Sequence, residues 1–130
     1  MKIGQAAARS GLPAKTLRYY DAIGLIRPSE RSETGYRLYN DQDVHLLRFV
    51  QRARSLGFTV DECRDLLDLY RDRERASADV KALAQARIAD IGRRLGQLRA
   101  MRESLEQLAA RCHGEDRPEC PILDDLAGVH

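Results

Sequence analysis

Two of the three cysteines lie only eight positions apart, at Cys112 and Cys120. Gly114 and Pro118 in the stretch between them favour a loop that turns back on itself. Two thiolates brought together in this way are soft ligands, which suit Cu(I) and the related ions Ag(I) and Au(I). A reversible disulfide would use the same pair, so the spacing leaves a metal site and a redox switch both open.

His113 widens the range of metals, because an imidazole beside Cys112 would help to complete a zinc or lead site. Structural zinc needs four ligands, and no obvious further ligand stands near the pair. The local sequence argues against an enzyme with a cysteine nucleophile, because it lacks a base together with an orienting group. The third cysteine, Cys63, has a sufficient role as a small buried side chain, and we assign it no ligand role.

The elements on either side of this loop place the two thiols at opposite kinds of helix end. Pro121 suits the first position of a short helix that runs to Leu126, which makes Cys120 its N-cap, where the helix dipole favours a thiolate. Cys112 stands at the C-terminal end of a long helix, where the dipole disfavours its anion. A bound cation would offset that effect.

The long helix is predicted over residues 80–111, because apolar residues recur along it at steps of three or four. They are Val80, Ala84, Ile88, Ile91, Leu95, Leu98, Met101, Leu105, Leu108 and Cys112. At 1.5 Å per residue such a helix spans roughly 45–50 Å, more than the rest of this chain can cover. A narrow apolar seam flanked by Arg and Glu is typical of a coiled coil, so we interpret the segment as a dimerisation helix.

Charge is divided unevenly along the 130 residues. Residues 1–58 carry ten Lys and Arg against five Asp and Glu, whereas residues 59–130 carry twelve against fifteen. The basic first part indicates an anionic partner there. No apolar run reaches transmembrane length and no signal-peptide core is present, so we expect a cytoplasmic protein with no membrane partner. A structural disulfide between Cys112 and Cys120 is disfavoured in that reducing compartment.

The basic part begins with two short predicted helices, over residues 3–10 and about 14–23, each closed by a glycine. Two short helices around a tight turn are typical of a helix-turn-helix unit, whose second helix enters the major groove of DNA. Side chains that reach phosphates and bases stand on this second helix: Lys15, Thr16, Arg18 and Tyr19. An adaptor protein that holds a coiled coil but binds no DNA is a weaker alternative.

A hairpin, or wing, is predicted next, from extended stretches over residues 25–28 and 36–39 with a polar loop between them. Arg31, Tyr36 and Arg37 would then meet the sugar-phosphate backbone. Tyr36 and Tyr39 are expected to pack the wing onto the body with one ring face, while a hydroxyl or the neighbouring Arg touches phosphate.

Two further helices complete the first part. Asp41 opens a third helix, which Gly57 closes, and Thr59 with Glu62 forms a capping box at the start of a fourth. A polar connector then leads to Ser77, which is predicted to be the N-cap of the long helix.

As a set, these residues resemble the MerR family of transcriptional regulators over essentially the whole chain. The resemblance rests on short motifs in order, namely Ile3-Gly4-Gln5-Ala6-Ala7, Thr16-Leu17-Arg18-Tyr19-Tyr20-Asp21, Gly24-Leu25-Ile26, Arg31, Gly35-Tyr36-Arg37-Leu38-Tyr39 and Leu56-Gly57-Phe58. It implies a mostly α-helical fold, with a winged helix-turn-helix head, an antiparallel coiled-coil dimerisation helix and a C-terminal metal-binding loop. It also implies a homodimer that binds double-stranded promoter DNA and acts on RNA polymerase by distorting that DNA.

With this resemblance, we expect four segments: a winged helix-turn-helix DNA-binding domain over residues 1–70, a connector over 71–79, a dimerisation helix over 80–111, and a metal-binding loop with a short terminal helix over 112–130. The expected DNA-contacting residues are Lys15, Thr16, Arg18, Tyr19, Tyr20, Arg31, Tyr36, Arg37 and Tyr39.

Within the family, the loop is similar to that of copper-efflux regulators of the CueR type. Their pattern of two cysteines seven residues apart, followed by Pro-Ile, is reproduced by Cys112, Cys120, Pro121 and Ile122. In that subgroup a serine from the partner subunit lies over the metal, at the position of Ser77, where regulators of divalent ions carry a cysteine. The resemblance implies a two-coordinate Cu(I) site and activation of copper-resistance or efflux genes. A divalent-metal sensor (Zn, Pb or Hg) and a thiol-redox sensor on the same scaffold remain as alternatives.

Overall fold

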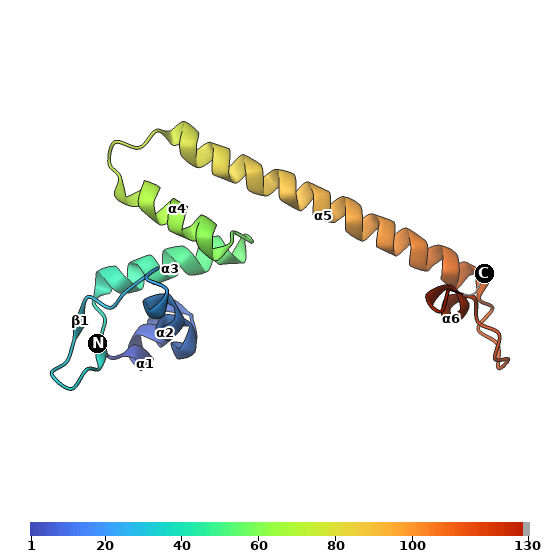
Figure 1. Cartoon of the computed structure of the whole chain (residues 1–130), viewed down its shortest axis with the longest axis horizontal. Helices are drawn as coiled ribbons and strands as arrows, with labels where there is room; N and C mark the ends of the chain where they lie inside the picture. Colours follow the sequence, from blue (N-terminus) through green and yellow to red (C-terminus); the bar gives the residue numbers. More distant parts are fainter. Residues whose placement is uncertain (129–130) are drawn as a thin grey trace. The chain divides into compact units, whose positions relative to one another are not determined.

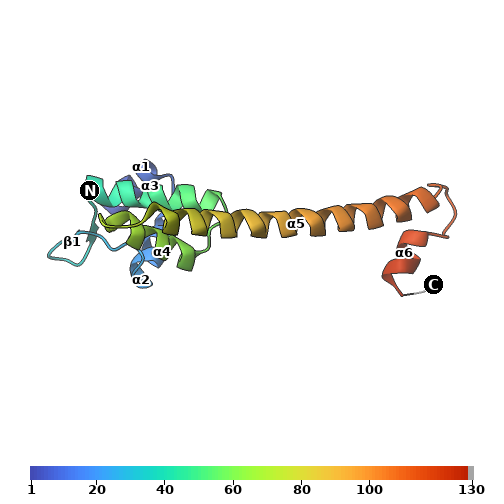
Figure 2. The ribbon, with the colours of Figure 1, turned by 90° about the horizontal axis from the view of Figure 1, so that it is seen from above.

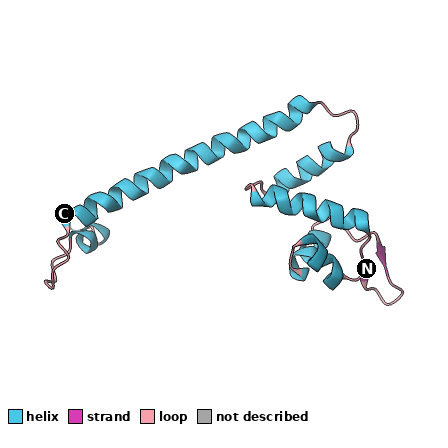
Figure 3. Cartoon of the chain, turned by 180° about the vertical axis from the view of Figure 1, so that it is seen from behind, coloured by secondary structure: helices cyan, strands magenta, loops and turns pink. Residues whose placement is uncertain are grey.

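The computed structural model describes residues 1–128, which are mostly helical with one small pair of strands, as predicted (Figure 3). In chain order the elements are α1 (Ile3–Ser10), α2 (Ala14–Ala22), β1 (Glu30–Arg31), β2 (Arg37–Leu38), α3 (Asp41–Ser55), α4 (Val60–Arg71), α5 (Ser77–Arg111) and α6 (Pro121–Leu126) (Figure 1). Two compact units divide the chain, the first being Met1–Ala84 and the second beginning at Gln85. The predicted division into four segments stays a prediction, and residues 129–130 of its last segment lie outside the described residues.

The first unit is built around one hydrophobic core. Helix α1 contacts α2 and α3, and α3 contacts α4. The core is formed by Ala6, Leu17, Tyr20, Leu25, Ile26, Tyr39, Val44, Leu46, Leu47, Val50, Ala53, Phe58, Cys63 and Leu67. Burial of these side chains is the main force that holds the four helices together. Cys63 is fully buried among them, in agreement with its predicted packing role.

Hydrogen-bonded caps define where the helices of this unit begin. The predicted capping box is present at α4, where the Thr59 hydroxyl accepts from the N–H of Glu62 at 3.1 Å and the Glu62 carboxylate accepts from the N–H of Thr59 at 2.9 Å. A second capping box, formed by Asn40 and Asp43, starts α3. Gly11 ends α1 with a φ of 77°, a conformation that glycine adopts at little cost.

The wing differs from its prediction in its first strand. Strand β1 pairs antiparallel with β2, with Glu30 opposite Leu38 and Arg31 opposite Arg37. The predicted strand over residues 25–28 is wrong, because the N–H groups of Leu25 and Ile26 both donate to the carbonyl of Tyr20 at the end of α2. Both side chains are buried, so their apolar character serves the core and not a sheet.

Helix α5 begins at Ser77, three residues before the predicted start. Ser77 is therefore the first residue of the helix and not its N-cap as predicted. The apolar stripe used for the prediction starts only at Val80, whereas the polar first turn contains residues that a helix also accepts at its start. The N–H of Asp79 donates to the carbonyl of Ala76 at 3.1 Å in this turn.

The second unit contains most of α5, the cysteine loop and α6. Leu108 is the one buried residue that the structure describes in α5, and the apolar stripe before it is exposed. Figures 1 and 2 both show α6 beside the last turns of α5. Among the described residues, no helix combines the length and apolar character that a membrane crossing requires.

Candidate functional site

Cys112 and Cys120 lie at two helix ends in the second unit. Cys112 directly follows α5, and its backbone N–H donates to the carbonyl of Ala109 at 3.1 Å. Cys120 is the N-cap of α6, and its carbonyl accepts from the N–H of Asp124 at 3.0 Å. Both thiols are free and half-buried. These positions are the ones expected, with Pro121 in the first turn of α6.

A surface hollow of about 450 Å³ lies beside Cys112 and is also lined by His113, Glu115 and Glu119. Within residues 1–128, no group of three or more His, Cys, Asp and Glu side chains is arranged to hold one ion. Cys112 and His113 both line this hollow, so a thiol and an imidazole are donors available at its surface. The assignment of Cys112 and Cys120 as ligands stays a prediction.

Ser77 belongs to the other unit, where it is exposed at the first position of α5. The predicted contact of this residue with a metal concerns the partner subunit, so it also stays a prediction.

The candidate DNA-contacting residues of α2 divide into surface and core positions. Lys15, Arg18 and Tyr19 are exposed, Tyr19 at 53%, and Thr16 is half-buried. Tyr20 points into the core and is only 4% exposed. The first group is in a position to meet a ligand at the surface of α2.

The two buried tyrosines, Tyr20 and Tyr39, do not fit the predicted DNA-contacting role. Tyr39 is 2% exposed, and its hydroxyl has no hydrogen-bond partner among the described residues. Burial raises the pKa of both phenols above the ordinary value. We correct the predicted set accordingly: both side chains hold the core together, and neither reaches the surface of the wing or of α2.

The wing arginines share one carboxylate, which the sequence reasoning missed. Arg31 Nη2 and Arg37 Nε each donate to Asp21 Oδ2 at 2.7 Å. Burial alone would raise the pKa of the Asp21 carboxyl, but the hydrogen bonds and charges of Arg37 and Arg31 outweigh it and hold this pKa below its ordinary value. A carboxylate in the last turn of a helix, where the dipole disfavours it, was the available signal.

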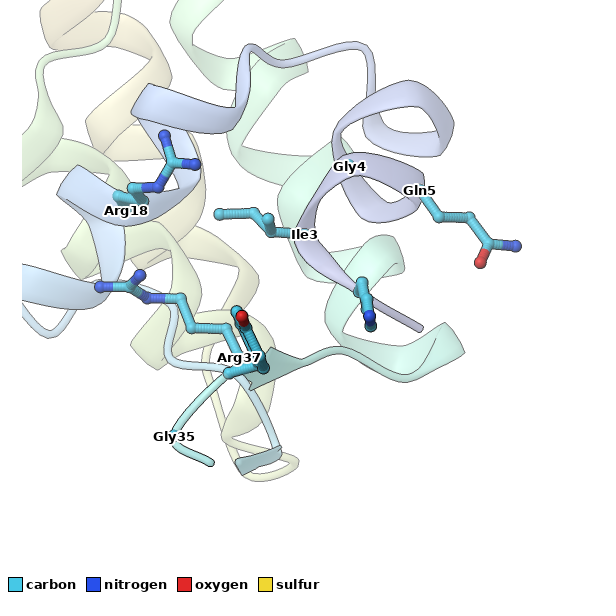
Figure 4. Close-up of a pocket in the computed structure, with 8 residues that line it drawn as sticks. Ile3, Gly4, Gln5, Arg18, Gly35 and Arg37 are labelled. Atoms are coloured by element: carbon cyan, nitrogen blue, oxygen red, sulfur yellow. The ribbon is translucent and has the colours of Figure 1, made fainter. Parts of the chain in front are cut away.

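A second hollow, of about 520 Å³, lies between α1, α2 and the wing (Figure 4). Arg18 of α2 and Arg37 of β2 line it, as do Lys2 and Tyr36. The Lys2 ammonium lies 5.4 Å from the centre of the Tyr36 ring, which is 62% exposed. Three cationic side chains around one hollow favour an anion, and Lys2 is a member of this group that the sequence reasoning did not single out.

Comparison of the chain with models of known protein families shows which family it belongs to. The family model described as "MerR HTH family regulatory protein" matches residues 1–69, and that described as "MerR, DNA binding" matches residues 44–108. The chain belongs to the MerR family. Its first unit thus contains a MerR-type helix-turn-helix DNA-binding domain with a small two-stranded wing, and the predicted resemblance is confirmed.

Relatives within the MerR family match almost end to end. The HTH-type transcriptional regulator HmrR of Rhizobium leguminosarum bv. viciae is 58% identical over 127 residues, which are 98% of each chain. The HTH-type transcriptional regulator CueR of Salmonella typhimurium is 41% identical over 128 residues, 98% of this chain and 93% of that one. A crystal structure of PbrR691 from Ralstonia metallidurans CH34, in complex with lead(II), is 32% identical with a TM-score of 0.84, covering 97% of this chain and 98% of that one.

Proposed function

We propose that this MerR-family chain is a metal-responsive regulator, with no enzymatic role, that binds promoter DNA as a homodimer in the cytoplasm. Binding of Cu(I) by Cys112 and Cys120 activates copper-resistance or efflux genes. The observation that carries the proposal is the pair of free, half-buried thiols at the end of α5 and the start of α6. Similarity to CueR of Salmonella typhimurium supports it.

The proposed metal centre uses the two thiolates alone. Thiolates are soft donors, so Cu(I), Ag(I) and Au(I) suit them, and two donors satisfy a monovalent ion. Ser77 of the partner subunit is proposed to lie over the ion without adding a third thiolate.

A divalent-metal sensor is the second candidate, because His113 lines the same hollow as Cys112 and PbrR691 was crystallised with lead(II). A thiol-redox sensor would use the same two cysteines through a disulfide.

The proposed homodimer is supported by the exposed stripe of α5. Five large apolar side chains are half or more exposed, at 50–66%: Ile88, Leu95, Leu98, Met101 and Leu105. A continuous apolar stripe of this length is typical of a helix that packs against a second helix. We propose that the second helix is α5 of another copy, in the antiparallel arrangement that the family resemblance implies.

The proposed DNA contacts come from the surface of the first unit. They are made by Lys15, Thr16, Arg18, Tyr19, Arg31, Tyr36 and Arg37. Bound metal shifts the equilibrium between two arrangements of the dimer only to the extent that it binds one of them more tightly than the other. We propose that the metal-bound arrangement distorts the promoter so that RNA polymerase can start transcription.

Anaerobic competition between Cu(I) and Zn(II) for the reduced full-length chain tests the metal assignment. We expect one Cu(I) for each Cys112–Cys120 pair, undisturbed by excess Zn(II). Cys112→Ser and Cys120→Ser should lose tight Cu(I) binding and keep DNA binding, whereas Cys63→Ala, which removes the buried thiol, should keep both. Displacement of copper by zinc, or no tight Cu(I) binding, would contradict the proposal and make His113→Ala the next variant to test.

A further inference from the structure

Asp21 carries a negative charge in a place that is unfavourable for it. It lies in the last turn of α2, where the helix dipole disfavours an anion, and its side chain is only 8% exposed. A buried carboxylate costs stability unless it is paired and hydrogen-bonded. Its two ion-pair partners in the described part of the chain both belong to the wing, Arg31 on β1 and Arg37 on β2. The negative charge of Asp21 is therefore balanced by the two arginines of the wing.

The wing needs such a partner, because Arg31 and Arg37 face each other in the strand register. Like charges directly opposite on antiparallel strands repel. Each strand has only two residues, and so short a hairpin has little stability of its own. One oxygen of Asp21, at 2.7 Å from both guanidinium groups, offsets the repulsion and ties both strands to α2.

Both arginines keep donors for a second anion. Their side chains are 50% and 30% exposed, and each uses one nitrogen on Asp21, Nη2 of Arg31 and Nε of Arg37. A guanidinium has five N–H donors in a fixed plane, so holding one nitrogen also aims the others. Arg37 lines the same hollow as Arg18 of α2 (Figure 4).

We propose that Asp21 is a positioning residue for DNA binding, which holds Arg31 and Arg37 at a fixed place relative to the contacts of α2. The carboxylate itself stays buried and touches no phosphate. This inference rests on the proposed DNA-contacting role of the wing and of α2. Asp21 thus sets the distance between the phosphate contacts that the wing makes and the groove contacts that Lys15 and Arg18 make.

The direction in which one substitution changes the affinity for DNA distinguishes a positioning role of Asp21 from a simple effect of its charge. Asp21→Asn removes a negative charge from a basic surface, so a pure charge effect would tighten DNA binding. Loss of positioning would weaken it. Asp41→Asn is a matched control, because Asp41 lies in the same unit and also pairs with an arginine at 2.8 Å, but that arginine is Arg9 of α1 and not a residue of the wing.

The experiment measures affinity of the reduced full-length variants by fluorescence anisotropy. The probe is a labelled duplex that the wild-type protein selects from a random-sequence library, titrated between about 50 and 200 mM salt. We expect Asp21→Asn to bind about tenfold more weakly, with a salt slope that is smaller by about one for each phosphate that the wing no longer neutralises. Asp41→Asn should bind as tightly as the wild type or slightly more tightly. Circular dichroism confirms that every variant is folded at the temperature used.

A double-mutant cycle distinguishes positioning from a general effect on the fold. In an Arg31→Gln, Arg37→Gln background, Asp21→Asn should cause no further loss of affinity. An additional loss of affinity in that background would overturn the inference about Asp21 but not the proposed DNA-binding function. A folded Asp21→Asn variant that binds DNA as tightly as Asp41→Asn would do the same. A wild-type chain that selects no duplex would overturn the proposed DNA-binding function and this inference with it.

Discussion

At the scale of single residues, the two buried tyrosines of the first unit differ in how their hydroxyls are satisfied. The Tyr39 hydroxyl is buried without a hydrogen-bond partner among the described residues, whereas the Tyr20 hydroxyl is not left in that state. Leaving a buried polar group unpaired costs about 1–3 kcal/mol. The core thus contains one tyrosine, Tyr39, whose hydroxyl opposes stability.

Tyr39→Phe should leave the free energy of unfolding unchanged or raise it by about 1 kcal/mol, because it removes only the unpaired hydroxyl. Tyr20→Phe is the control at the other buried tyrosine and should lower it by about 1 kcal/mol, because the hydroxyl removed there is not one left buried and unpaired. Urea unfolding measures both values. A clear loss of stability in Tyr39→Phe would show that its hydroxyl does have a partner.

Asp21 also predicts how stability depends on pH. Its pKa is lower in the folded chain than the ordinary value of 3.8, so the unfolded chain takes up the proton first as the pH falls. The stability that Asp21 contributes is therefore full above about pH 4 and is lost as the pH falls further, through the folded pKa.

Thermal unfolding of Asp21→Asn and wild type from neutral to acid pH measures this effect. We expect the wild type to be more stable at neutral pH and the difference to shrink below about pH 4. The exposed Asp41, which forms a surface ion pair, should give Asp41→Asn little difference at any pH. A difference between Asp21→Asn and wild type that stays constant down to about pH 2 would contradict the linkage.

At the scale of elements, the helices could be predicted because their start and stop signals are local. Thr59 with Glu62, Gly11 and Pro121 act on their own helices, so each was readable from neighbouring residues. The predicted strand over residues 25–28 is wrong because apolar composition alone does not distinguish a strand from an irregular segment that is buried in the core. The positions of Cys112 and Cys120 at helix ends followed from local signals too, whereas the burial of Tyr20 and Tyr39 and the link from Asp21 to the wing depend on contacts distant in sequence.

Helix α5 contains two glycines, Gly92 and Gly96, where a Cβ atom would meet nothing within 4 Å. Glycine inside a helix costs about 1 kcal/mol relative to alanine. Gly96→Ala should therefore raise the free energy of unfolding by about that amount, together with the helical signal in circular dichroism. Decreased stability in this variant would contradict the open surroundings of Gly96.

At the scale of the whole molecule, the exposed stripe of α5 gives the sharpest test of the proposed homodimer. Leu98→Glu introduces a charge into the stripe, where Leu98 is 59% exposed. Gln97→Glu is the matched control, since it adds the same charge one residue away, about 100° around the helix. Sedimentation should find Leu98→Glu as a monomer and Gln97→Glu as a dimer. A dimeric Leu98→Glu chain would exclude this stripe as the dimer contact.

The order of the segments has a consequence for synthesis on the ribosome. The core of the first unit is complete at Leu67, whereas the exposed stripe of α5 lies further along the chain. Proteins fold from the N-terminal side as they emerge. A nascent chain should therefore present a folded, basic surface before the stripe proposed as the dimer contact has emerged from the ribosome. Pairing then becomes a late, concentration-dependent step.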